Sequence, residues 1–383
     1  MVRVGYKQTD VGEIPEDWEV KDIESIASIT TGNKNTQDRI SDGIYPFYVR
    51  SQTVERINSY SFDGEAVLTA GDGVGTGKIF HYVNGKFDYH QRVYNIHNFK
   101  PKVNGFYFYK YFSDRFYDRI MSMTAKSSVD SVRREMIAEM KIAIPPEPEQ
   151  KEIATALSNI DELIISLEKM LTKKLDIKTA AMQQLLTGKK RLTGFGEGKG
   201  YKQTELGKIP EDWSLKKIGD LLKIKHGKSQ KEIIDPNGEY PILATGGEIG
   251  RASLPLYSKP SVLIGRKGTI DIPYYMETPF WTVDTLFYSE VSRNADAKFI
   301  YYKFCFIDWY QYNEASGVPS LNAATIEKII QSVPGTKDEQ TAISTVLTDF
   351  DVEIKALQLK LSKTKSMKQG MMQELLTGRT RLL

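Results

Sequence analysis

The sequence predicts a mixed α/β protein made of two copies of one unit, each a globular domain followed by a long helix. Similar text opens both copies, similar text closes both, and an apolar pattern of helical spacing recurs in the same register between these ends. Hydrophobic residues make up 40% and charged residues 26% of the 383 residues. These fractions are ordinary for folded proteins, and the length suggests two or three domains of roughly 100–200 residues.

The repeat is clearest at its two ends. Residues 6–23 read YKQTDVGEIPEDWEVKDI, and residues 201–218 read YKQTELGKIPEDWSLKKI. Residues 183–192 read QQLLTGKKRL, and residues 373–382 read QELLTGRTRL. Preserved ends predict one architecture used twice. Because the intervening stretches differ, we expect either two different targets or a duplicated fold whose loops have drifted.

The two divergent middles are predicted to be globular α/β domains, at residues 24–144 and 219–333. Short, aromatic-rich runs within them favour strands, and longer runs with aromatic residues favour core-facing helices. The strand-like runs lie at 45–49 and 262–264, and the helical runs at 105–120 and 296–312.

A long helix follows each middle. Apolar residues there alternate in steps of four and three, which keeps a seam facing a partner helix. The seam positions are Ile153, Leu157, Ile160, Ile164, Leu167 and Leu171, and in the second copy Ile343, Leu347, Phe350, Ile354, Leu357 and Leu361. The first helix, expected over 151–186, would be about 54 Å long at roughly 1.5 Å per residue. We expect the two helices to pack together, with another subunit's helices as the alternative partner.

Apolar residues near the far ends of these helices allow two interpretations. They either join a core or form a docking patch for a partner protein. The residues are Met182, Leu185, Met371, Met372 and Leu375.

Composition limits the class of protein. No apolar run approaches the roughly 18 residues of a membrane span, and the first residues lack the apolar run of a signal peptide, so we expect a cytoplasmic location. The single cysteine, Cys305, lies between two phenylalanines and is expected to be a buried thiol. A net charge of +3 permits nucleic-acid binding without requiring it.

No motif predicts catalysis or a cofactor. The glycine-rich loop 71–78 has Asp72 where a nucleotide-binding loop needs glycine, and Ile79 where it needs Ser or Thr. The four histidines lack metal-ligand spacing, and no nucleophile–base motif is evident. We therefore expect no catalytic residue, cofactor or metal in this chain. A tight loop of this kind can still bring backbone N–H groups and a cation to a DNA phosphate or base edge.

Polar residues on corresponding loops of the two middles are the candidate DNA contacts. Arginine and lysine can bond guanine edges, and glutamine can bond adenine. Solvated surface is the alternative for each. The candidates are Lys78, His90, Gln91, Arg92, Lys126, Ser127 and Ser128 in the first copy, and Lys228, Arg266, Lys267, Trp281, Thr282, Ser316 and Ser320 in the second.

Three sets of repeated motifs carry a family resemblance. They are Ile-Pro-Glu-Asp-Trp at 14–18 and 209–213, Glu-Gln at 149–150 and 339–340 with the apolar residues and aspartate that follow, and Leu-Leu-Thr-Gly at 185–188 and 375–378. With these motifs the chain resembles, over essentially its whole length, the specificity subunit of type I restriction–modification enzymes.

The resemblance implies a division of labour. Two target-recognition domains would each read one half of a split, asymmetric site in double-stranded DNA. Two helical regions would form an antiparallel coiled coil that spaces these domains and docks two methyltransferase subunits, and through them restriction (nuclease/translocase) subunits. S-adenosylmethionine, ATP and magnesium would belong to those partners. A non-DNA adaptor with two ligand-binding domains on a coiled coil is the alternative.

The expected boundaries follow from the resemblance and the repeat. They are target-recognition domain 1 at 1–150, helical spacer 1 at 151–192, target-recognition domain 2 at 193–338 and helical spacer 2 at 339–383.

Overall fold

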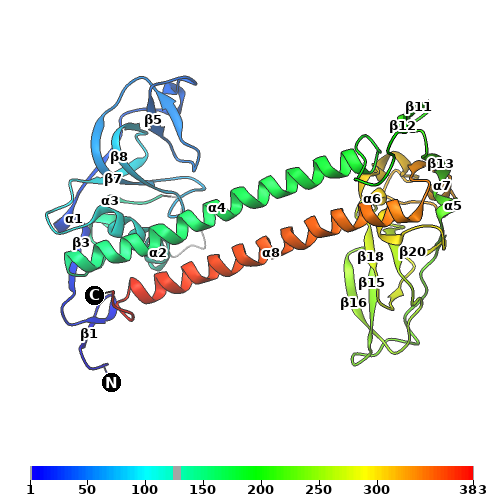
Figure 1. Ribbon diagram of the computed structural model, residues 1–383. Coiled ribbons are helices and arrows are strands. Elements are labelled where there is room, and N and C mark those ends of the chain that lie inside the picture. Colours follow the sequence, from blue (N-terminus) through cyan, green and yellow to red (C-terminus); the bar gives the residue numbers. More distant parts are fainter. Residues whose placement is uncertain (1, 124–130, 383) are drawn as a thin grey trace. The chain divides into compact units, whose positions relative to one another are not determined.

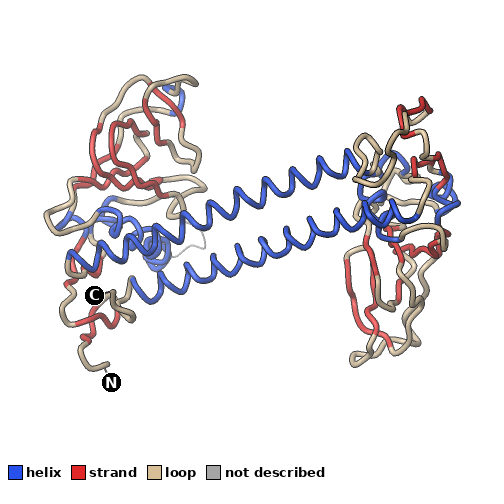
Figure 2. The backbone as a smooth tube through the Cα atoms, in the orientation of Figure 1, coloured by secondary structure: helices blue, strands red, loops and turns tan. Residues whose placement is uncertain are grey.

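A computed structural model describes residues 2–123 and 131–382 (Figure 1). The chain forms two compact units: unit 1 is residues up to 168 together with those from 360 onward, and unit 2 is residues 169–359. The long helices α4 (Glu147–Leu185) and α8 (Lys337–Leu375) each contribute to both units. Each unit therefore combines one globular domain with the start of the helix that follows it and the end of the other copy's helix. Strands are confined to the globular domains (Figure 2).

The domain of unit 1 is built on a six-stranded sheet in the order β4-β9-β7-β8-β5-β6, mostly antiparallel, with β5 and β8 parallel. Its elements are β1 (Tyr6–Thr9), β2 (Gly12–Pro15), β3 (Glu19–Asp22), α1 (Ile23–Ile26), β4 (Ser28–Thr31), η1 (Thr36–Asp38), β5 (Tyr45–Tyr48), β6 (Glu55–Ile57), β7 (Phe62–Ala70), β8 (Phe80–Tyr89), β9 (Val93–His97), α2 (Gly105–Ser122), α3 (Arg134–Ala138) and β10 (Lys141–Ile144).

The domain of unit 2 has a four-stranded sheet, β14-β20-β17-β18, and a three-stranded sheet, β16-β15-β19, in which β15 and β19 are parallel. Its elements are β11 (Tyr201–Thr204), β12 (Gly207–Pro210), β13 (Ser214–Lys217), α5 (Ile218–Leu221), β14 (Leu222–Lys225), β15 (Tyr240–Ala244), β16 (Gly247–Ala252), β17 (Ser261–Gly265), β18 (Tyr274–Met276), β19 (Trp281–Thr282), β20 (Leu286–Val291), α6 (Ala297–Phe306), η2 (Trp309–Tyr312), α7 (Ala323–Lys328) and β21 (Ile330–Val333).

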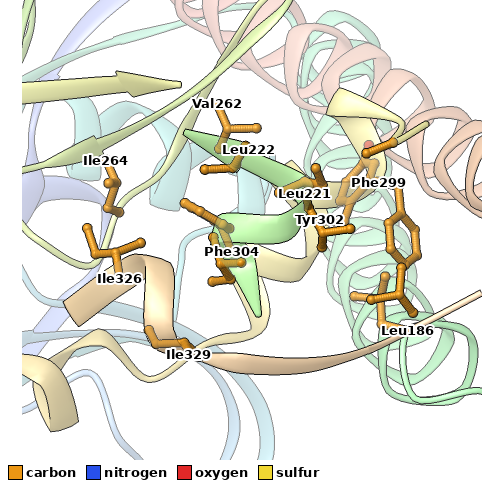
Figure 3. Close-up of a cluster of buried hydrophobic side chains, with 14 of the residues drawn as sticks. Leu186, Leu221, Leu222, Val262, Ile264, Phe299, Tyr302, Phe304, Ile326 and Ile329 are labelled. Carbon is orange, nitrogen blue, oxygen red and sulfur yellow. The ribbon is translucent and has the colours of Figure 1, made fainter. Parts of the chain in front are cut away.

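Each domain core forms where an aromatic helix packs beside the sheet. In unit 1, Phe108, Phe112 and Phe116 of α2 are fully buried, and Phe112 stacks between the other two. In unit 2, Phe299, Tyr302 and Phe304 of α6 lie in one cluster with Leu186, just after the end of α4 (Figure 3). The predicted helix at 105–120 and strands at 45–49 and 262–264 are confirmed.

The second aromatic run and the cysteine differ from expectation. The run predicted to be helical over 296–312 breaks after Phe306, because the Asp308 side chain accepts from the Tyr310 N–H and starts the short helix η2. Cys305 lies on the outward face of α6 and is exposed, so the expectation of a buried thiol was wrong. The core side of this helix is formed by its neighbours Lys303 and Phe304.

The long helices begin earlier than the apolar pattern indicates. Helix α4 starts at Glu147 instead of 151, with Pro148 in its first turn, where the missing N–H has no helical partner to lose. Its end at Leu185 leads into Gly188, whose φ of 70° suits a left-handed cap. A Cβ atom at Gly188 would also lie 2.6 Å from the Pro210 ring. Both requirements recur at Gly378 beside Pro15.

The two helices pack antiparallel in each unit, as interhelical ion pairs show. In unit 1, Asp161 pairs with Lys368 at 2.7 Å and Glu168 with Lys365 at 2.7 Å. In unit 2, Lys174 pairs with Glu353 at 2.6 Å and Lys178 with Asp351 at 2.5 Å. In both units, higher numbers on α4 meet lower numbers on α8. The predicted antiparallel coiled coil is confirmed.

The seam residues are buried to different extents. Those nearest each domain join its core, and the others are partly covered along the helices. Fully or nearly buried are Ile153, Leu157, Ile160, Leu167, Ile343, Leu347 and Ile354, and half-buried are Ile164, Leu171, Phe350, Leu357 and Leu361.

The opening motif of the first copy and the closing motif of the second copy meet in one cluster within unit 1. The indole of Trp18 donates to buried Glu149 at 3.0 Å, and Arg381 binds both Glu149 and Asp17. In unit 2, Trp213, Glu339, Arg191 and Asp212 repeat these contacts. The closing segment of each copy is therefore built into the domain of the other copy. Around these clusters the methionines and leucines of the helix ends pack into the domain cores, which favours the core interpretation.

Candidate DNA-binding interface

Corresponding loops converge in each domain through the same backbone hydrogen bonds. In unit 1 the Gly71 N–H donates to the Arg92 carbonyl, and the Val132 N–H donates to the Gly71 carbonyl. In unit 2 the Arg266 N–H donates to the Thr285 carbonyl, and the Leu321 N–H donates to the Arg266 carbonyl. The loop after β7 or β17 is thus held between the loop that precedes β9 or β20 and a downstream segment.

A fourth loop joins each group through a close glycine contact. A Cβ atom at Gly32 would lie 1.9 Å from the Tyr89 carbonyl oxygen, and one at Gly227 would lie 2.1 Å from the Val283 carbonyl oxygen. Only glycine permits this approach, so the equivalent glycine in each copy fixes the loop against the strand end. The two domains share one backbone scaffold that can carry different side chains.

In unit 1 two guanidinium groups on this scaffold pair with one carboxylate. Asp72 pairs with Arg50 at 2.6 Å and with Arg92 at 3.5 Å, and the two arginine side chains are 42% and 63% exposed. Arg50 was missed by sequence reasoning, because nothing near β5 marks it and only the sheet brings it to Asp72. The loop leaves positive charge in excess at the surface, which suits a polyanion.

Amide and imidazole groups lie beside this arginine pair. The Gln91 amide donates to the Asn35 side chain at 2.6 Å, so Asn35 is a second residue that sequence reasoning missed. His90 is 4% exposed, and its Nδ1 accepts from the Arg92 N–H at 2.9 Å. Burial, together with the nearby charge of Arg50, lowers the pKa of His90. His90 therefore orders the loop from within, whereas Gln91 and Arg92 face solvent.

The structure links the remaining candidate residues of the first copy less closely to this loop group. Lys78 is exposed, with its ammonium 5.2 Å from the centre of the Tyr117 ring. Three candidates, Lys126, Ser127 and Ser128, lie outside the described residues.

In unit 2 the same backbone scaffold carries a different set of side chains. Arg266 pairs with Asp284 at 2.6 Å, and the neighbouring Lys267 is exposed. The Trp281 indole donates to the Lys228 carbonyl at 2.9 Å, which leaves the exposed Lys228 side chain on a fixed loop.

The other candidate residues of the second copy differ in how far their side chains are exposed to solvent. Ser320 lies opposite Lys267 in a β-bridge, and Ser316 is exposed in the same loop. Thr282 is fully buried, so its side chain supports the strand end instead of facing solvent. Structure thus gathers Lys228, Arg266, Lys267 and Ser320 through their loops.

No described helix is long and apolar enough to cross a membrane. No group of three or more His, Cys, Asp or Glu side chains in this part of the chain could hold a metal ion.

Comparisons with known proteins point to one family. The model of the type I restriction modification DNA specificity domain matches twice, at residues 15–177 and 210–363. The chain is 25% identical to the "Putative type I restriction enzyme MjaX specificity subunit" of Methanocaldococcus jannaschii, over 98% of this chain and 97% of that protein. It is 27% identical to the type I restriction enzyme EcoDI specificity subunit of Escherichia coli, over 56% and 50% of the two chains.

A solved structure shares the fold. The type I restriction–modification S subunit from M. genitalium superposes with a TM-score of 0.69 at 16% identity, covering 96% of this chain and 97% of that one. The two matches of the family model fall on the two copies, and together they span most of the chain. This chain therefore belongs to the family of type I restriction–modification DNA specificity subunits.

Proposed function

We propose that the two loop groups each read one half of a bipartite, asymmetric DNA site. The observation that carries the proposal is the shared backbone scaffold with different side chains, Arg50–Asp72–Arg92 in unit 1 and Arg266–Asp284 with Lys267 in unit 2. Proteins distinguish bases by the side chains that contact the base edges. Two domains with the same backbone scaffold but different side chains are therefore suited to two different half-sites.

The helices α4 and α8 have a separate role in this proposal. Each has 39 residues, about 58 Å at roughly 1.5 Å per residue. This length exceeds one DNA turn of roughly 34–36 Å. Because each helix begins in one unit and ends in the other, we propose that the pair sets the spacing between the half-sites. We further propose that it docks two methyltransferase subunits and, through them, restriction subunits.

The chain itself is proposed to be non-catalytic and to act in the cytoplasm. S-adenosylmethionine, ATP and magnesium would be bound by the partner subunits. The chain's own residues would bind DNA and orient those subunits on it.

Reconstitution tests the proposal. The chain with its methyltransferase subunits should methylate a split sequence, which methylation-sensitive sequencing of the host genome would identify. The chain alone should neither methylate nor cleave DNA, nor hydrolyse ATP. Failure of the assembled complex to bind any duplex at low salt would favour the non-DNA adaptor. Turnover by the chain alone, surviving removal of contaminants, would overturn the non-catalytic assignment.

A further inference from the structure

Unit 2 contains a pocket of about 840 Å³ beside the end of α6. This volume lies within the roughly 300–1,000 Å³ typical of small-molecule sites. Its walls come from the β11–β12 hairpin, α6, η2 and β21. Leu206 and Phe306 line it and are 50% and 44% exposed, so apolar surface stands open to solvent at this place.

The pocket forms where the two copies differ in helix length. The aromatic helices start alike, since Asn104 caps α2 and Asp296 caps α6 through a side-chain oxygen that accepts an N–H three residues on. Helix α2 then runs for 18 residues, whereas α6 stops after 10 and turns into η2. The turn brings Asp308 and Tyr312 into the pocket lining.

The pocket is also more polar than the same positions in the first copy. The helix caps and the strand registers fix the correspondence between the copies. The side chains differ between the copies at four positions that line the pocket. Lys208 replaces the acidic Glu13 of the first copy, and Lys303 replaces the neutral Tyr111. The polar Gln331 and Ser332 replace the apolar Ile142 and Ala143.

Lys303 is the least expected of the four, because it is only 5% exposed. Its ammonium donates to the Leu186 carbonyl at 2.7 Å and to the Ser332 hydroxyl at 3.4 Å, both of them neutral oxygens. An ammonium has three N–H donors, so one makes no hydrogen bond to these oxygens. Two aromatic rings near it are also neutral: the centres of the Phe299 and Trp213 rings lie 5.8 and 6.0 Å from the ammonium. Burial lowers the pKa of Lys303 to about 7. A buried cation held by neutral groups is costly, and an anion in the pocket would supply the missing counter-charge.

We propose that this pocket binds a small aromatic organic anion, a phosphate monoester or a carboxylate. The anionic group would lie at Lys303, within reach of Lys208 and Lys189 at the rim, and the ring would pack on Phe306 and Tyr312. Asp308 is the carboxylate in the lining, and its charge disfavours a second negative group on the ligand. This site is independent of DNA reading, and its key residues are present in one copy only.

A structural role for Lys303 is the competing explanation. Its hydrogen bond to Leu186 follows the end of α4, where a cation is favourable in any case. This role alone would make the residue matter for folding and not for ligands. The test must therefore measure binding, and it needs a variant that cannot affect the core.

Calorimetric titration of the full chain with 1-naphthyl phosphate provides this test. We expect saturable binding to one site, and at least tenfold weaker binding of the neutral 1-naphthalenemethanol. Lys303→Met and, separately, the exposed Lys208→Met should each weaken binding of the phosphate about tenfold or more. Lys298→Met is the matched control on α6, because that ammonium lies over the Tyr275 ring outside the pocket, and it should bind as the unaltered chain does.

Three results would overturn the assignment. The first is the absence of saturable binding at millimolar 1-naphthyl phosphate, and the second is equal binding by the unaltered chain and the Lys208→Met variant. The third is loss of probe binding when the chain is assembled with its methyltransferase subunits, since the pocket would then be a protein contact. If Lys303→Met fails to fold, Lys208→Met alone decides between the outcomes.

Discussion

The Arg381 guanidinium donates two hydrogen bonds to the Asp17 carboxylate, at 3.0 and 2.7 Å, although 364 positions separate the two residues. The same guanidinium binds Glu149, which is almost fully buried. Arg191 does the same with Asp212 and Glu339 in unit 2. Through these clusters, the last residues of each copy complete the domain of the other.

Arg381→Ala should destabilise unit 1 by about 3 kcal/mol, because it leaves the buried Glu149 carboxylate without its cation. Urea unfolding followed by tryptophan fluorescence can measure this, since Trp18 is the tryptophan of that unit. Arg379→Ala is the matched control: its side chain is exposed and lies 4.0 Å from Glu374, so the change should stay within about 0.5 kcal/mol. Equal effects of the two substitutions would contradict the cluster's role.

Asp212→Asn should reduce the amount by which the free energy of unfolding of unit 2 falls at acidic pH. The hydrogen bond from Arg191, opposed in part by burial, lowers the pKa of Asp212 below its ordinary 3.8. A lowered carboxylate pKa adds stability above the ordinary value, and this stability is lost as pH falls through the folded value. Urea unfolding between about pH 5 and pH 2 should show a smaller loss in the variant. Parallel pH dependences would show that this carboxylate is not linked to folding.

Arg266→Ala should weaken DNA binding of the assembled complex without unfolding it. Loss of a base contact would cost about 1–3 kcal/mol and relax one position of the site, whereas loss of a phosphate contact would weaken all sequences alike and reduce the salt dependence. Lys267→Ala separates the two residues of the loop, and Lys355→Ala, an exposed lysine of α8, is the control. Unchanged binding in both loop variants would remove this loop from the interface.

Replacing residues 24–144 with the corresponding domain of another family member should change one half of the recognised site. The replaced stretch includes the Arg50–Asp72–Arg92 loops but leaves Asp17, Trp18 and Glu149, so the cluster that holds the domain is kept. Methylation-sensitive sequencing reads the outcome. A change in both halves would mean that the loop groups do not act separately.

Lengthening both helices by four residues should change the spacer and leave both half-sites unaltered. Insertions after Leu171 and after Leu361 lie between the ion pairs of Lys365–Glu168 and of Lys174–Glu353, so both sets can persist. Four residues add about 6 Å, nearly two base-pair steps of roughly 3.4 Å. Inserting in α4 alone should instead disturb packing and serves as the comparison. A doubly extended chain that assembles but keeps the original spacer would show that the helices do not set the distance.

By itself, the sequence determined the duplication, the two long helices and the family. Local patterns in the sequence carry these features: similar ends of the two copies, a four–three apolar alternation and motifs such as Ile-Pro-Glu-Asp-Trp. The aromatic helix at Gly105–Ser122 and the strands at Tyr45–Tyr48 and Ser261–Gly265 followed from the same kind of pattern. Such patterns depend on residues that are close along the chain, so they predict individual helices and strands well.

Only the tertiary structure decided which elements meet. Arg381 reaches Asp17 and Arg191 reaches Glu339 because each copy's closing segment follows a helix into the other copy's domain. Arg50 joins Asp72, and His90 turns inward while Gln91 turns out, because sheet pairing and not sequence distance sets these contacts. The early end of α6, beside which the pocket at Lys303 forms, depends on one side chain, Asp308, that competes with the helix for a backbone N–H.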